Sequence, residues 1–148
     1  MSVPDPLQAP LEQLCASVPE AVGVVLCDFE GETVVTRLGA GAPPAAAALR
    51  AQDHVPKTLA MQMPVAEFLM RLAAAEPCAP LRHFAACTQA SGFGKVSGME
   101  ARYADVEVLT ECLPEDFYLV LVLRRPSLSF RARRHLQRAA HQLAPQLA

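Results

Sequence analysis

The chain has 148 residues, the size of a single domain, and 52% of them are hydrophobic against 19% charged, so it can form a packed core and is not disordered throughout. Its formal net charge of −2 gives no overall attraction to polyanions such as nucleic acid. The charge is nevertheless uneven, because residues 117–148 hold six arginines and no acid, whereas residues 1–116 hold seven basic and fifteen acidic residues. We therefore expect one domain with a basic C-terminal part.

The sequence contains neither a membrane-spanning pattern nor a secretion signal. Its longest unbroken apolar run, residues 117–123, is far shorter than the ~20 residues that span a bilayer. The first ten residues, MSVPDPLQAP, carry Asp5 where a signal peptide would be hydrophobic. We expect a cytoplasmic protein without direct membrane insertion.

The five cysteines are an odd number at wide spacings, without a CxxC pair or a matching histidine spacing for zinc. This pattern predicts reduced and mostly buried thiols, and no metal site. The cysteines are Cys15, Cys27, Cys78, Cys87 and Cys112.

The first quarter of the chain predicts a helix followed by a β-hairpin. Leu7, Leu11, Leu14 and Val18 recur at helical spacing, and Pro19 ends the helix. The runs AVGVVLCDF (21–29) and ETVVTRL (32–38) are β-branched and apolar, so they predict two strands. Residues 28–31 form the expected turn, in which glycine tolerates a positive φ.

The middle of the chain predicts helices interrupted by prolines. Residues 39–63 are rich in alanine and proline and are interpreted as an insertion or irregular segment, with a short helix over 44–52. A stronger apolar stripe indicates a helix from Pro64 to Pro77, and a second one from Pro80 to Gly92. Residues 81–89 also have a composition compatible with a strand, although the helical spacing is favoured.

Three strands and a helix complete the chain, with the strands over 97–103, 107–112 and 117–124. In the middle strand Val108 and Thr110 alternate with Glu107 and Glu111, which predicts one buried and one wet, acidic face. The last strand is apolar on both faces, so we expect it at the centre of the sheet. Past Pro126 the spacing predicts an amphipathic helix with a basic outer face. Its apolar stripe is Leu128, Ala132, Leu136, Ala139, Ala140, Leu143 and Leu147.

The sequence offers no catalytic or cofactor site. The turn Gly92-Phe-Gly94-Lys95 lacks the first glycine and the Ser or Thr of a phosphate-binding P-loop. The acids around Gly31 lack the spacing of a calcium loop. The four histidines are scattered, so no nucleophile–base pair can be argued, and the basic helix without lysine or Trp is interpreted as a solvated face rather than a nucleic-acid site.

The order of these elements resembles the roadblock (dynein light chain) family. The segments that carry the resemblance are VVLCDFEGETVV (24–35), SGFGKVSGMEARY (91–103) and FYLVLVL (117–123). The resemblance implies an α+β fold of the roadblock/longin/profilin type, with about five antiparallel strands flanked by helices. It also implies dimerisation through the second helix and third strand, and docking to a small Ras-like GTPase or to a signalling or motor scaffold complex.

We therefore predict a non-enzymatic dimeric adaptor that pairs with itself or with a paralogous roadblock protein. Two groups of residues are its candidate contacts. The dimer edge comprises Ala85, Ala86, Met99, Ala101 and Tyr103, and the surface for an acidic partner comprises Arg131, Arg133, Arg134 and Arg138. The alternative is a ligand-sensing module of PAS-like or profilin-like shape, which a deep apolar pocket beneath the helices would favour.

Overall fold

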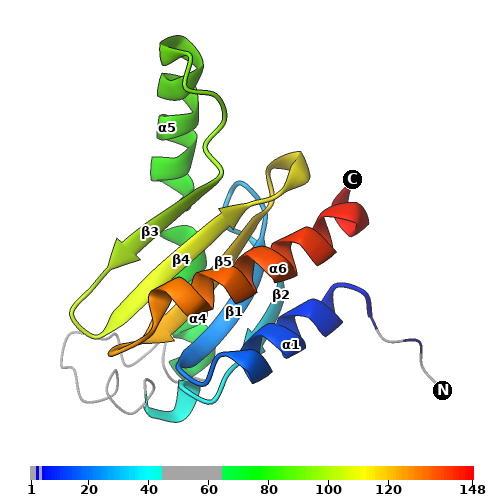
Figure 1. Cartoon of the computed structure of the whole chain (residues 1–148), viewed down its shortest axis with the longest axis vertical. Helices are drawn as coiled ribbons and strands as arrows, with labels where there is room; N and C mark the ends of the chain where they lie inside the picture. The colour runs from blue at the N-terminus through cyan, green and yellow to red at the C-terminus, as the bar shows by residue number, and fades with distance from the viewer. Residues whose placement is uncertain (1–2, 4, 45–64) are drawn as a thin grey trace.

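The computed structural model describes residues 3, 5–44 and 65–148, and it confirms an α+β architecture with one five-stranded antiparallel sheet (Figure 1). The strand order is β2-β1-β5-β4-β3, so β5 lies at the centre as predicted, and β2 and β3 form the edges. The strands are β1 (Ala21–Cys27), β2 (Thr33–Leu38), β3 (Gly98–Arg102), β4 (Val106–Cys112) and β5 (Tyr118–Arg124). The helices are α1 (Gln8–Ser17), α4 (Val65–Ala75), α5 (Cys78–Ser91) and α6 (Ser129–Leu147), with a 3-10 turn η1 (Pro114–Asp116).

The predicted turn between β1 and β2 is confirmed. The carboxylate of Asp28 accepts hydrogen bonds from the backbone N–H groups of Glu30 and Glu32, both at 3.0 Å. Gly31 has a φ of +86°, a left-handed conformation that glycine adopts at little cost. The side chain of Asp28 thus fixes the reversal that places β2 beside β1.

The helices α1 and α6 cover one face of the sheet (Figure 1). The strands present leucines to this face, among them Leu26, Leu109, Leu119, Leu121 and Leu123. The predicted stripe of the last helix is confirmed at Leu136 and Leu143, which are both 0% exposed. It is wrong at Leu128, which is 64% exposed because this residue precedes the first helical turn and does not share the buried face of α6.

The opposite face carries α4 and is built mainly from smaller side chains. The strands contribute Val22, Val25, Val108, Val120 and Val122 to it. Met70 of α4 is fully buried and lies directly over Gly23, where an added Cβ would come within 2.9 Å of the Met70 sulfur and 2.7 Å of the Arg37 carbonyl oxygen. The absence of a side chain at Gly23 therefore allows α4 to approach the sheet closely.

The predicted break between two helices at Pro77 is confirmed, as is the helix rather than a strand over residues 81–89. Gly92 closes α5 in a left-handed conformation, with φ of 76° and its N–H bonded to the Thr88 carbonyl at 3.1 Å. Beyond the break α5 projects past the end of the sheet (Figure 1). The predicted irregular segment 39–63 and short helix 44–52 lie, from residue 45 on, outside the described residues.

Candidate functional site

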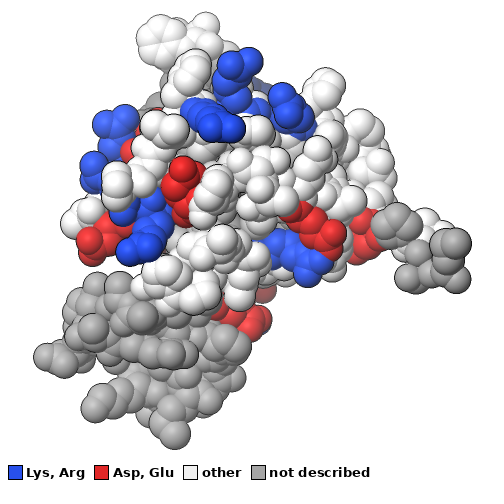
Figure 2. All heavy atoms as spheres, turned by 60° about the horizontal axis from the view of Figure 1, so that its bottom comes forward, with Lys and Arg blue, Asp and Glu red and all other residues white. Residues whose placement is uncertain are grey.

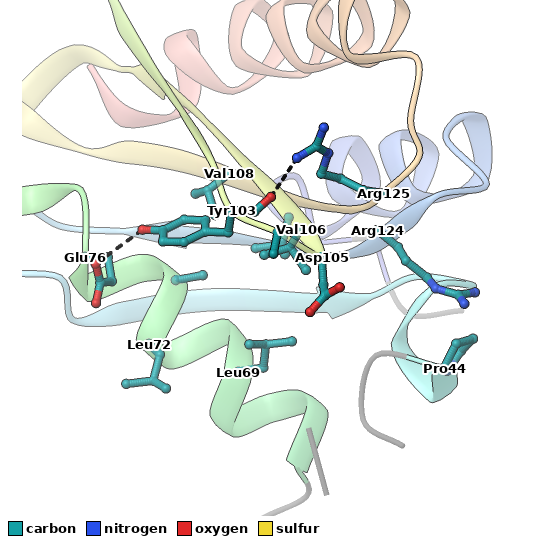
Figure 3. A pocket seen from close by; sticks show the side chains of 13 residues that line it. Pro44, Leu69, Leu72, Glu76, Tyr103, Asp105, Val106, Val108, Arg124 and Arg125 are labelled. Carbon is teal, nitrogen blue, oxygen red and sulfur yellow. Dashed lines mark hydrogen bonds between the residues drawn. The ribbon is translucent and has the colours of Figure 1, made fainter. Parts of the chain in front are cut away.

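A cavity of about 550 Å³ lies on the α4 side of the sheet, between this helix and the turn that joins β3 to β4. Its floor is formed by Val106, Val108 and Val122, and α4 supplies Leu69 and Leu72 as one wall (Figure 3). The volume falls within the range of about 300–1,000 Å³ that is typical of small-molecule sites. Most of the lining is apolar, so the cavity can receive an apolar group.

Tyr103 closes one end of this cavity. Its hydroxyl donates a hydrogen bond to Glu76 Oε2, at the end of α4, over 3.4 Å (Figure 3). Burial, and then the negative charge of Glu76, raise the pKa of the Tyr103 hydroxyl. The backbone of Tyr103 is also held, because its N–H donates to the Val106 carbonyl and its own carbonyl accepts from Arg125 Nη1, both at 2.8 Å. Tyr103, which the sequence analysis assigned only to the dimer edge, therefore also connects the end of β3 with the end of α4.

The other end of the cavity is charged. Asp105 and Arg124 lie there beside Pro44, with the Asp105 carboxylate directed into the space between the sheet and α4 (Figure 3). Over the described parts of the chain, no group of three or more His, Cys, Asp or Glu side chains is placed to hold a metal ion. An apolar body with a few polar groups at its ends is suited to binding rather than to bond chemistry.

The predicted dimer edge divides between two elements at the β3 side of the molecule (Figure 1). Met99 and Ala101 are half-buried on β3, which is an edge strand as expected. Ala85 and Ala86 are exposed on α5. Residues 82–87 are all exposed, and Phe84 retains 51% of its accessible surface. Among the described residues, no further strand pairs with the outer side of β3, and α5 carries an exposed aromatic ring.

The four predicted partner-binding arginines do not share one surface. Arg131, Arg134 and Arg138 are exposed on α6. Arg133 instead points to the sheet and forms an ion pair with Glu100 of β3. Arg133 thus lies on the flank of α6 that meets β3, away from the other three arginines, and its role as a partner contact stays a prediction.

The predicted wet, acidic face of β4 is also wrong, because α6 and the segment before it cover this face. Glu107 is 5% exposed and is bonded to Arg102 Nε at 3.0 Å and to the hydroxyl of Ser127 at 2.9 Å. Burial raises the pKa of the Glu111 carboxyl, while Arg133 and then Gln137 lower it. Arg133 is thus the arginine of the basic C-terminal part that interacts with acidic residues of β3 and β4.

Two exposed apolar side chains lie at the start of α6, near the exposed arginines of this helix. Phe130 is 78% exposed in the first turn of α6, and Leu128 precedes it. Figure 2 shows arginine and lysine side chains gathered across the upper and left parts of one face, with acidic side chains between and below them. The exposure of Phe130 could have been predicted from the sequence. This residue precedes Arg134 by four positions, so both lie on the side of α6 away from its apolar stripe.

Among the helices that the structure describes, none combines the length and the apolar character needed to cross a membrane. Neither a scan of protein-family models nor a search of curated proteins found a match to the chain. Solved structures do match it closely in shape.

MglB of Myxococcus xanthus superposes with a TM-score of 0.67 at 11% identity, covering 99% of this chain and 98% of that one. A Roadblock/LC7 domain from Streptomyces avermitilis gives 0.62 at 13% identity, covering 93% and 94%. An MglB with a tetrameric arrangement gives 0.66 at 17% identity, covering 98% and 92%. The chain therefore has the roadblock fold, as the sequence resemblance implied.

Proposed function

We propose that the chain is a non-enzymatic roadblock-family adaptor, which acts as a dimer in the cytoplasm and binds a small Ras-like GTPase or a signalling or motor scaffold complex. The observation that carries this proposal is the likeness to MglB along almost the whole of both chains. The edge strand β3 and the exposed surface of α5, over which no described element lies, support a self-associating role, and one of the similar structures is described as tetrameric.

The dimer is proposed to form through the edge strand β3 and the exposed helix α5. An isolated helix of 14 residues is marginal in water, and α5 projects with most of its surface exposed. The edge strand β3 offers backbone groups that a second β3 can pair with. A second copy would cover both features at once, whether as an identical chain or as a paralogue.

Sedimentation at micromolar concentration tests this dimer. We expect a species of twice 15.9 kDa for the natural chain. The variant Glu100→Pro should shift the population to monomer, because the strand register places the N–H of residue 100 on the free side of β3, where a second β3 would bond to it. The variant Thr36→Pro, whose N–H lies on the free side of the opposite edge strand β2, is the matched control and should remain dimeric. A purely monomeric natural chain, or a dimer that survives Glu100→Pro, would contradict the proposal.

The partner surface is proposed to be the exposed side of α6 around Phe130, Arg131, Arg134 and Arg138. Arginines beside an exposed aromatic ring suit an acidic protein surface that also accepts an apolar anchor. Purification from the native cytoplasm, followed by binding of the captured GTPase as a pure protein, tests this. We expect Arg134→Glu to weaken the binding, while Arg133→Ala, on the flank facing the sheet, should affect it less.

The cavity favours a second function, ligand sensing. It has an apolar floor and lies beneath α4, as that alternative requires. Native mass spectrometry of the purified chain tests it: a small molecule that remains bound to the natural chain and is lost from Val108→Phe would favour sensing. A chain of unmodified mass that binds no apolar fluorescent probe, such as 1-anilinonaphthalene-8-sulfonate, would remove this alternative.

A further inference from the structure

The helix α5 carries a pair of metal-ligating side chains that none of the surfaces above uses. Cys87 Sγ lies 3.8 Å from His83 Nε2, one helical turn away, and both side chains are exposed. Residues four positions apart lie on the same side of a helix. The two atoms therefore face the same volume of solvent.

The separation of these atoms suits one zinc ion. Zinc binds a cysteine sulfur at about 2.3 Å and a histidine nitrogen at about 2.0–2.1 Å, and two such ligands at a tetrahedral angle lie roughly 3.5 Å apart. The 3.8 Å between Cys87 Sγ and His83 Nε2 is close to this value. The described part of one chain adds no third ligand to form a cluster. One copy thus supplies half of a tetrahedral site.

A second copy can supply the other half, and this step rests on the dimer proposed above. The middle of α5 lies at Phe84 and Ala85. Residues 83 and 87 share the side of α5 opposite Ala85, because each residue turns the helix by about 100°. If two such helices pack antiparallel on the side that carries residues 83 and 87, about a two-fold axis at the level of residue 85, residue 83 of one copy faces residue 87 of the other. The neighbouring residues Ala86 and Ala90 are small and exposed, so they leave room for close approach.

Cys87 is more exposed to solvent than the other four cysteines, which makes its thiol accessible to a metal ion. Cys27 and Cys78 are buried, and Cys15 and Cys112 are partly buried, whereas Cys87 is exposed. Burial raises the pKa of the Cys27 thiol to about 12 and that of the Cys15 and Cys112 thiols to about 11, which opposes formation of the thiolate that zinc requires.

We propose that His83 and Cys87 form half of a structural zinc site, and that two copies of α5 complete it with two cysteines and two histidines. On binding, each Cys87 thiol releases its proton to solvent and its sulfur coordinates as the thiolate, while each His83 binds as the neutral imidazole. Two protons are therefore released per zinc ion, and the affinity rises with pH.

Cobalt titration of the full chain under reducing conditions tests the site, with zinc as the competitor. We expect the sulfur-to-cobalt charge-transfer band and the visible bands of a tetrahedral site, saturating at one cobalt per two chains and abolished by zinc. Cys87→Ser and His83→Ala should each lose these bands. Cys15→Ser and His141→Ala are the matched controls and should retain them.

Sedimentation of the metal-free and zinc-loaded chain separates this inference from the dimer. A metal-free dimer that shows no tetrahedral cobalt bands overturns the zinc site and leaves the dimer standing. A monomer that becomes a dimer on adding zinc supports the site and makes the dimer metal-dependent. Bands that persist in Cys87→Ser, or saturation at one cobalt per chain, overturn the shared site.

Discussion

The described helices pack differently on the two faces of the sheet. The face under α1 and α6 is closed, because leucines from the strands meet leucines from two helices. On the face under α4, the described residues leave a cavity of about 550 Å³ beside β4, and α5 projects away from the sheet. The described part of the chain thus packs one face more completely than the other.

The central strand shows how one segment serves both faces. In β5 the residues alternate, with Leu119, Leu121 and Leu123 on the α6 side and Val120 and Val122 on the α4 side. Large side chains fill the space beneath α1 and α6, whereas smaller ones allow α4 to come close to the sheet. Alternation of side-chain size, and not only of polarity, therefore distinguishes the two layers.

The largest expected effect is the loss of packing on the closed face. Leu136→Ala should lower the free energy of unfolding by ~2–5 kcal/mol, because this fully buried side chain would leave a cavity. Leu72→Ala, at the wall of the open cavity, should cost less than about 1 kcal/mol, since this side chain is 44% exposed. Urea denaturation of both variants measures the difference, and equal losses would contradict the contrast between the faces.

A smaller effect is expected from crowding the contact between α4 and β1. Gly23→Ala should destabilise the fold by ~1–3 kcal/mol, because the new Cβ would lie 2.7 Å from the Arg37 carbonyl oxygen, a backbone atom that cannot turn away. Thermal unfolding checks this. An unchanged melting temperature would mean that α4 does not hold its close approach over Gly23 in solution.

Alkaline pH should weaken the fold through its buried thiols. In the unfolded chain a cysteine releases its proton near the ordinary pKa of 9.0, whereas in the folded chain burial keeps Cys27 protonated up to about 12. Stability is therefore full below pH 9 and falls as the pH rises toward 12, by at most about 1.4 kcal/mol per pH unit for each such thiol. Denaturation at pH 8 and pH 10.5 measures it, and Cys27→Ala should show a shallower decline.

The smallest effect on stability is expected at the exposed arginines. Replacing Arg131, Arg134 and Arg138 by glutamate should leave the melting temperature nearly unchanged, while slowing association with an acidic partner and reducing the salt dependence of that association. Arg133→Glu should cost about 1 kcal/mol, because it sets a third carboxylate beside Glu100 and Glu111. If the triple variant unfolds while Arg133→Glu does not, the two sides of α6 have been assigned the wrong way round.

Local patterns in the sequence were sufficient to predict most of the secondary structure and the central position of β5. Apolar spacing predicted α1, α6 and the two helices on either side of Pro77, and the apolar run in β5 predicted its central position. These features depend on residues close together in the chain.

The candidate site depended on contacts between distant segments, which a single sequence does not reveal. The helical spacing grouped Arg133 with the exposed arginines, although the position of β3 decides that it pairs with Glu100. The alternation in β4 predicted solvent over Glu107, although Ser127 and Arg102 cover it. The cavity is lined by residues from separate elements, among them Tyr103 and Glu76, which are hydrogen-bonded to each other.

Because the chain breaks between α4 and α5, α5 extends as a separate helix from a short joint at residues 76–77. The helix α5 has 14 residues, so its tip lies about 21 Å from the joint. A rotation of roughly 10° at the joint would move the tip by about 4 Å. The residue just before Pro77 is Glu76, which Tyr103 holds at the mouth of the cavity. The hydrogen bond from Tyr103 to Glu76 therefore lies beside the joint from which α5 projects.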